Sequence, residues 1–157
     1  MRRQAASPVT HRPRTAALLL ALALAAAASA ARPDYSEDFG PYRVHYSALP
    51  TDRLLPAVAK SYRIDRSRGR GLVNIAVQRA AAGNTSAPIR AAVSGNARPL
   101  AGASTELRFR EIVEEGAVYY ISEFPVSAPD TIRFSISITP EGETSPYLLK
   151  FNQDFAD

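Results

Sequence analysis

Residues 131–139 have the sequence Thr-Ile-Arg-Phe-Ser-Ile-Ser-Ile-Thr, in which apolar and polar side chains alternate without a break. Successive side chains of a β-strand point to opposite faces of its sheet. The apolar members of this stretch would therefore share one face, and they are Ile132, Phe134, Ile136 and Ile138. The alternation predicts a half-buried strand with a polar outer face.

Other stretches of the chain show the same period of two, and they are Tyr42–Ser47, Gly71–Arg79, Ile89–Gly95 and Tyr147–Phe155. Thr105–Glu114 is also predicted as a strand, with a break near Glu111 that is typical of a bulge. Ala117–Phe124 is predicted as a strand too, but its apolar residues are too continuous to assign a face. The turn residues Glu114-Glu115-Gly116 are typical of a hairpin and favour antiparallel pairing. One segment has a helical period instead, which predicts a short helix, and its apolar members are Leu55, Val58, Ala59 and Tyr62.

These elements predict an all-β fold, because strands predominate and no strand–helix–strand spacing occurs. We expect an Ig-like antiparallel β-sandwich of about seven strands with one short helix. The cysteines and tryptophan of immunoglobulin domains are absent, so the likeness would lie in architecture only. A small β-barrel is the alternative.

The amino-terminal residues have the layout of a secretory signal peptide. Four arginines precede Ala16–Ala28, a run of alanine and leucine only, and Ala28-Ser29-Ala30 is an A-x-A cleavage site. The run is shorter than the roughly 20 apolar residues that span a bilayer. We therefore predict a signal peptide over 1–30 that is cleaved between Ala30 and Ala31. A flexible arm over 31–41 and a single domain over 42–157 would follow, in the periplasm and without stable membrane insertion.

Composition excludes several classes of function. The chain has 19 basic and 15 acidic residues, and residues 1–30 hold four of the basic ones and none of the acidic. The remainder is balanced in charge, so we expect no nucleic-acid partner. The absence of cysteine excludes disulfides and thiolate metal sites. Outside the leader His45 is the single histidine, and we expect no metal, cofactor or catalytic residue.

Several segments in order along the mature chain resemble the family catalogued as domain of unknown function 4426. They are Tyr42–Tyr46, Tyr62–Ile64 with Arg66-Ser67, Arg70–Ile75, Leu107–Ile112 and Val118–Ile121. No single piece is specific, but the ordered set is. The resemblance implies export to the periplasm and a β-rich domain. It carries no established activity, so it assigns no role to any residue.

Four arginines fall within eight residues, and they are Arg63, Arg66, Arg68 and Arg70. Guanidinium groups on a glycine-containing loop can bind carboxylates or phosphates through two parallel hydrogen bonds. The alternative is ion pairing within the chain, because residues 111–157 hold nine acidic groups and only two basic ones. The sequence leaves both interpretations open.

The function that the sequence favours is a non-enzymatic binding or interaction module of the cell envelope. Its partner would be a periplasmic protein or an envelope component, and the residues expected to contact it are Arg66, Arg68, Arg70, His45 and Tyr120. One alternative is a small-ligand carrier with a pocket between the sheets. The other is a hydrolase-like enzyme that uses His45 with Glu111 or a serine.

Overall fold

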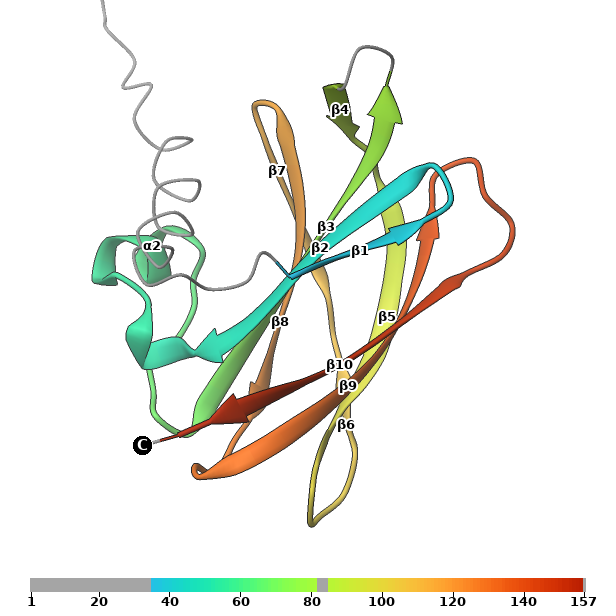
Figure 1. The fold of residues 1–157 in the computed structure, drawn as a ribbon. Helices are drawn as coiled ribbons and strands as arrows, with labels where there is room; N and C mark the ends of the chain where they lie inside the picture. The colour runs from blue at the N-terminus through green and yellow to red at the C-terminus, as the bar shows by residue number, and fades with distance from the viewer. Residues whose placement is uncertain (1–34, 82–84, 157) are drawn as a thin grey trace, which may run out of the picture.

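The alternating stretches form strands that pair into two antiparallel sheets packed face to face (Figure 1). The structure is a computed structural model, and it describes residues 35–81 and 85–156. The strands are β1 (Ser36–Phe39), β2 (Tyr42–Pro50), β3 (Arg70–Ala81), β4 (Thr85–Pro88), β5 (Ala91–Pro99), β6 (Thr105–Leu107), β7 (Arg110–Glu114), β8 (Ala117–Pro125), β9 (Asp130–Pro140) and β10 (Tyr147–Phe155). The all-β sandwich predicted from the sequence is confirmed.

The two sheets have different strand orders. The first sheet runs β1-β2-β3-β8-β7, and β4 pairs with the end of β3 that β8 does not reach. The second sheet runs β10-β9-β5-β6. Every pairing in both sheets is antiparallel, as the hairpin signals of the sequence indicate.

The main hydrophobic core lies between the two sheets. All four apolar side chains of β9 that the alternation assigns to one face are at most 2% exposed, and they are Ile132, Phe134, Ile136 and Ile138. They pack against inward residues of the first sheet such as Val44, Val73 and Ile75, each fully buried. The predicted strand faces are therefore correct where the alternation is unbroken.

A second, smaller core lies on the outer face of the first sheet. The segment after β2 forms a 3-10 turn, η2 (Thr51–Arg53), and a short helix, α2 (Pro56–Ser61). Val58 and Ala59 of the helix pack onto Leu72 and Ile121 of the sheet. Leu55, predicted on the buried face, is 54% exposed because it precedes the first helical residue.

Three expectations from the sequence need correction. The described residues form ten strands rather than about seven. Residues 105–114, predicted as one strand, divide between β6 in the second sheet and β7 in the first. Ser36–Phe39 lie in the predicted flexible arm, but they form β1. This strand pairs antiparallel with Tyr42–His45 of β2, and the pairing holds the segment against the sheet. The predicted leader and its cleavage site at Ala30 and Ala31 lie outside the described residues.

Candidate functional site

The loop between α2 and β3, residues 62–69, holds most of the arginine cluster. Arg63, the second residue of the loop, adopts a positive φ of 53°. The Arg63 and Ile64 N–H groups donate to the Lys60 and Ala59 carbonyls at 3.3 Å and 2.8 Å, which is the Schellman arrangement that ends helices. Glycine is the usual residue at this position, because the left-handed conformation crowds a Cβ. The helix thus ends sharply and directs the loop toward the end of the sandwich.

Thr51 holds this loop in place. Its hydroxyl is fully buried and lies 2.8 Å from the Asp65 carbonyl and 3.1 Å from the Ser67 carbonyl, and it accepts the Ser67 N–H at 2.9 Å. The Val126 N–H also donates to the Gly69 carbonyl at 3.0 Å. These bonds tie the loop to η2 on one side and to the segment after β8 on the other. The glycine-containing loop is therefore fixed at both of its ends.

The three arginines predicted to bind a partner have different surroundings. Arg66 donates to the Asp52 backbone carbonyl at 2.6 Å. Arg70 forms an ion pair with Glu123 at 3.3 Å, which is the pairing with the acidic carboxy-terminal half that the sequence left open. Arg68 contacts the Asp52 carboxylate only at 3.8 Å, and its side chain is 95% exposed. All three are exposed, and Arg68 combines a nearly fully exposed side chain with the weakest of these contacts.

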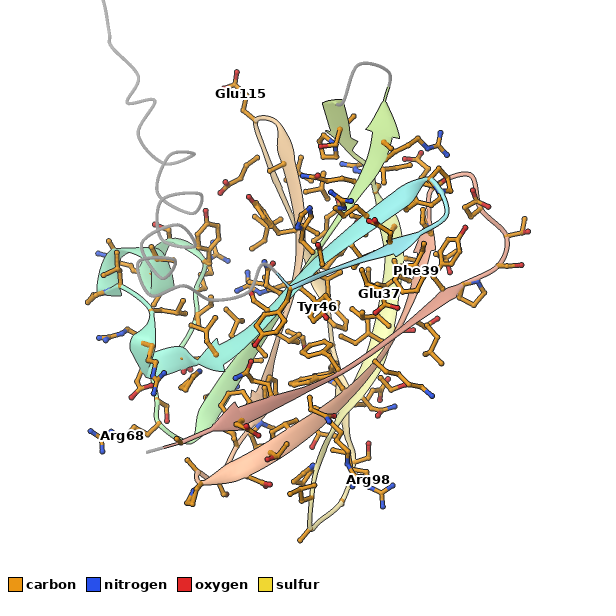
Figure 2. The ribbon with its side chains drawn as sticks, in the orientation of Figure 1. Glu37, Phe39, Tyr46, Arg68, Arg98 and Glu115 are labelled. Atoms are coloured by element: carbon orange, nitrogen blue, oxygen red, sulfur yellow. The ribbon has the colours of Figure 1, made fainter. Side chains whose placement is uncertain are left out.

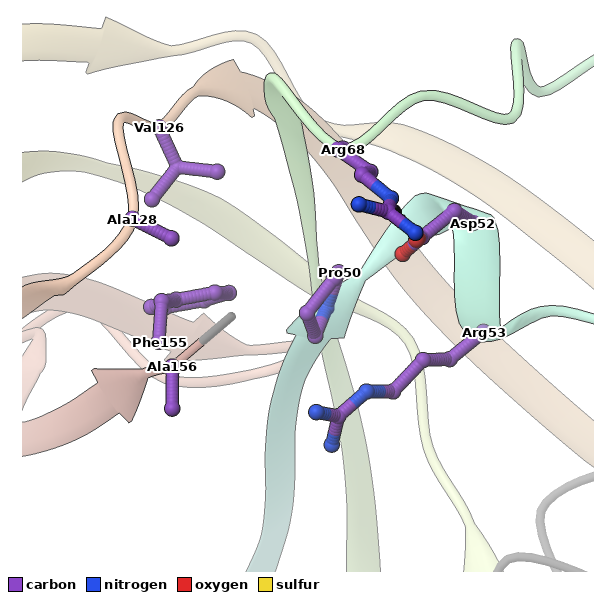
Figure 3. A pocket seen from close by; sticks show the side chains of 8 residues that line it. All are labelled: Pro50, Asp52, Arg53, Arg68, Val126, Ala128, Phe155 and Ala156. Atoms are coloured by element: carbon purple, nitrogen blue, oxygen red, sulfur yellow. Dashed lines mark ion pairs between the residues drawn. The ribbon is translucent and has the colours of Figure 1, made fainter.

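Arg68 lines a hollow of about 150 Å³ at the end of the sandwich, which we call the terminal pocket (Figure 3). The side chains of η2 and the loop stand on one side, and those that follow β8 and end β10 stand on the other. Its lining residues are Pro50, Asp52, Arg53, Arg68, Val126, Ala128, Phe155 and Ala156. Val126 and Phe155 are 6% and 2% exposed, so the floor is part of the apolar core.

The rim of the terminal pocket carries an excess of positive charge. Its lining holds two guanidinium groups, those of Arg53 and Arg68, and one carboxylate, that of Asp52, which lies beside Arg68 (Figure 3). Among the described residues the Arg53 guanidinium has no ion-pair or hydrogen-bond partner. Guanidinium groups donate in a planar fork that matches a carboxylate or a phosphate. The arrangement can hold an anionic group at the rim and a small apolar group on the floor.

A line of aromatic contacts leads along one side of the sandwich to this pocket. Tyr42 and Tyr46 of β2 contact Tyr147 and Phe151 of β10, with ring centroids 6.0 Å and 4.5 Å apart. Four residues further along each strand, Pro50 and Phe155 meet at the terminal pocket. The pocket is thus the end of a packed apolar seam between the two sheets.

His45 lies apart from the terminal pocket. It is half-buried on the outer face of the first sheet, where its Nε2 lies 3.3 Å from the Gln78 Oε1. Glu111 pairs with Tyr120, whose ring packs into the core, so Glu111 and His45 belong to opposite faces of this sheet. The Ser47 hydroxyl shares the face of His45 and has no hydrogen-bond partner in the described part of the chain. The structure brings neither residue into a hydrolase-like arrangement with His45.

Tyr120 is a core residue, so its prediction as a partner contact is wrong. It is 5% exposed, and its hydroxyl accepts the Ala91 N–H at 2.8 Å and donates to a Glu111 carboxylate oxygen at 2.9 Å. The other Glu111 oxygen lies 3.4 Å from Arg90. Burial raises the pKa of Tyr120 to about 12. Tyr120 therefore links β8 to the start of β5 across the two sheets.

Sequence reasoning missed most of the terminal pocket. The sequence patterns do not single out Asp52 or Arg53, and they include Phe155 only as the end of the predicted strand Tyr147–Phe155. The sequence signal nearest to the pocket is Thr51-Asp52-Arg53, a polar and charged segment between two predicted elements, but it does not indicate which distant residues it meets. The described residues hold no cluster of metal-ligating side chains and no helix that could span a bilayer.

Comparison with known proteins identifies the family. A family model described as a domain of unknown function, number 4426, matches residues 36–157. A solved crystal structure of a member of that family, from Pseudomonas aeruginosa PAO1, is 34% identical and superposes with a TM-score of 0.65. The match covers 78% of this chain and 95% of that one. No curated protein matches the chain. The family model spans most of the sequence, and the chain belongs to the domain of unknown function 4426 family.

Proposed function

We propose that this chain is an exported, non-enzymatic binding module of the cell envelope. It holds an anionic group of a periplasmic protein or envelope component in the terminal pocket. The observation that carries the proposal is that two guanidinium groups, those of Arg53 and Arg68, line a pocket with an apolar floor and only one carboxylate, that of Asp52. Function in a sandwich fold must be argued from such a site, because the fold itself hosts many functions.

The size and rigidity of the pocket favour a small amphiphilic group. A cavity of about 150 Å³ accommodates a group about as large as benzene. Thr51 fixes the loop that carries Arg68 through three hydrogen-bond contacts at 2.8–3.1 Å, so little conformational entropy is lost when the ligand binds. A carboxylate next to a short apolar side chain satisfies both the rim and the floor.

A titration with matched small molecules tests this chemistry. Butyrate is expected to shift the amide resonances of Val126 and Phe155, whereas butanol and butylammonium shift them much less. The Arg68→Ala variant is expected to weaken butyrate binding by about tenfold, which corresponds to a loss of about 1.4 kcal/mol. Arg98→Ala is the matched control, because Arg98 is exposed on the second sheet and points away from the pocket (Figure 2).

The same variants test whether the terminal pocket is needed to capture a partner. Crosslinking in the periplasm should capture a partner with the unchanged chain and with Arg98→Ala, but much less with Arg53→Ala combined with Arg68→Ala. The loss should be larger at low salt, because exposed charges are screened beyond about 10 Å at 0.1 M salt. Equal capture by all variants would contradict the proposal, as would equal shifts by butyrate and butanol.

The two alternatives have less support from the geometry. A carrier needs a cavity of about 300–1,000 Å³. Two hollows among the described residues measure about 150 and 230 Å³, both below this range, and both border on Val126 at the end of the sandwich. A hydrolase needs a nucleophile or carboxylate within hydrogen-bond reach of His45. The Gln78 amide oxygen, 3.3 Å from the His45 Nε2, is neither of these.

A further inference from the structure

The open edges of the two sheets differ in length. An edge strand presents unpaired N–H and C=O groups, and natural proteins keep such strands short or interrupt them. Four edge strands follow this rule: β1 and β4 have four residues each, β6 has three and β7 has five. The remaining edge strand, β10, has nine residues and pairs with β9 along its whole length without a bulge. In the described chain no strand lies against its other side (Figure 1).

The β10 edge also has little of the usual protection. It contains no proline, its one lysine is Lys150, and Leu148 is 53% exposed. The Asp154 carbonyl accepts the Gln153 side-chain amide at 2.9 Å, which indicates that this carbonyl faces away from β9. Alternate residues of an antiparallel strand direct their backbone groups to the same side. Lys150 and Asn152 then present theirs along the same open edge.

We propose that β10 of a second copy of this chain pairs with this edge in antiparallel orientation, with the two Asn152 residues opposite each other. This register places Lys150 of each copy opposite Asp154 of the other. Both side chains are exposed on the outer face, and within the described residues Lys150 has no ion-pair partner. Opposite charges directly across a sheet are favourable. The two four-stranded sheets then join into one continuous sheet.

Charge selects this register over its neighbour. A centre at Phe151 would place Lys150 opposite Asn152, and Leu148 opposite Asp154, so neither charge would be matched. Within one copy Lys150 and Asp154 cannot pair, because four residues of strand separate them by about 13 Å. The two charges are therefore complementary only between copies.

The aromatic seam beside β10 gives the second copy a further surface to cover. Phe151 is only half-buried and contacts Tyr46 at 4.5 Å between ring centroids. Tyr35 lies 5.7 Å from Tyr46 by the same measure and is 42% exposed. A strand added to β10 keeps the inner face of both sheets on the same side, so it brings apolar residues next to these rings.

Charge exchange tests the proposal, with association measured by sedimentation velocity over a range of protein concentrations. The chain recovered from cells is expected to dimerise reversibly. Lys150→Asp and Asp154→Lys each place two like charges opposite each other, and each should weaken association at least tenfold. The double variant carries the exchanged pair and should recover association to within about threefold of the original. Arg98→Asp, a charge reversal away from the edge, should leave it unchanged.

A backbone variant makes the test independent of charge. Asn152→Pro removes one outward N–H without removing a bond to β9, so it should abolish association while the thermal melt stays close to that of the original chain. A chain that stays monomeric at every concentration would overturn the proposal, as would a double variant as weak as the single ones. Loss of capture of a different protein by Asn152→Pro, in a monomeric chain, would assign the edge to that protein instead.

Discussion

Replacement of Phe134 by alanine is expected to lower the free energy of unfolding by about 4–5 kcal/mol, at the upper end of the range of about 3–5 kcal/mol for a buried phenylalanine. The ring is 2% exposed, stacks on Phe151 with centroids 4.6 Å apart, and meets the edge of Phe124 at 5.3 Å. Each such pair contributes about 0.5–1.5 kcal/mol beyond the area it buries. Phe124 also packs on Phe155 at 5.7 Å, which limits its movement into the cavity.

Arg133→Ala is the matched control, one residue away on the opposite face of β9. Arg133 is exposed and lies directly across from Arg98 of β5. Like charges directly across a sheet are unfavourable, so removal of the Arg133 charge should be neutral or should stabilise the fold by a few tenths of a kcal/mol. Urea unfolding of both variants measures the two effects. Similar losses in the two variants would refute the assignment of strand faces.

Four further outcomes are expected. Arg63→Gly should raise the free energy of unfolding by about 1 kcal/mol in urea melts, because glycine adopts a positive φ without a Cβ clash. Gly95→Ala should destabilise the fold strongly in the same assay, because its Cβ would lie 2.5 Å from the Ser135 backbone oxygen. The pKa of Tyr120 is raised to about 12 in the folded protein, so its contribution to the free energy of unfolding is present below pH 10 and is lost as the pH rises toward 12. In Tyr120→Phe, the free energy of unfolding should therefore fall less between pH 10 and pH 12 than in the original chain. Intact-mass measurement of a periplasmic extract should find cleavage after Ala30, and recovery of the uncleaved chain in the inner membrane would contradict this.

Local alternation predicted the sandwich because it reports which side chains of a strand share a buried face. In β9 the alternation is unbroken, and every assigned residue lies in the core. The same period cannot tell which sheet a strand joins. Residues 105–114 fit a single strand with a break near Glu111, yet the chain passes from one sheet to the other between Leu107 and Arg110. Sheet membership depends on long-range pairing, which a local pattern does not contain.

The candidate site depended on contacts between distant residues and was predictable only in part. The sequence indicated that the arginine cluster would either bind anions or pair with the acidic carboxy-terminal half. The fold divides the cluster between these roles, since Arg70 pairs with Glu123 while Arg68 lines the terminal pocket. The pocket itself combines Asp52 with Phe155, which are about a hundred residues apart. No spacing rule connects such residues.

The surroundings of Arg68 allow recognition to be separated from stability. Its guanidinium is 95% exposed and meets Asp52 only at 3.8 Å, a surface pair that contributes at most about 1 kcal/mol. Arg70 differs, because its pairing with Glu123 joins the start of β3 to the end of β8. Substitution of Arg70 therefore changes both the fold and the charge of the loop. Because Arg68→Ala changes the charge alone, loss of binding in that variant, with an unchanged melting temperature, is attributable to recognition at the terminal pocket.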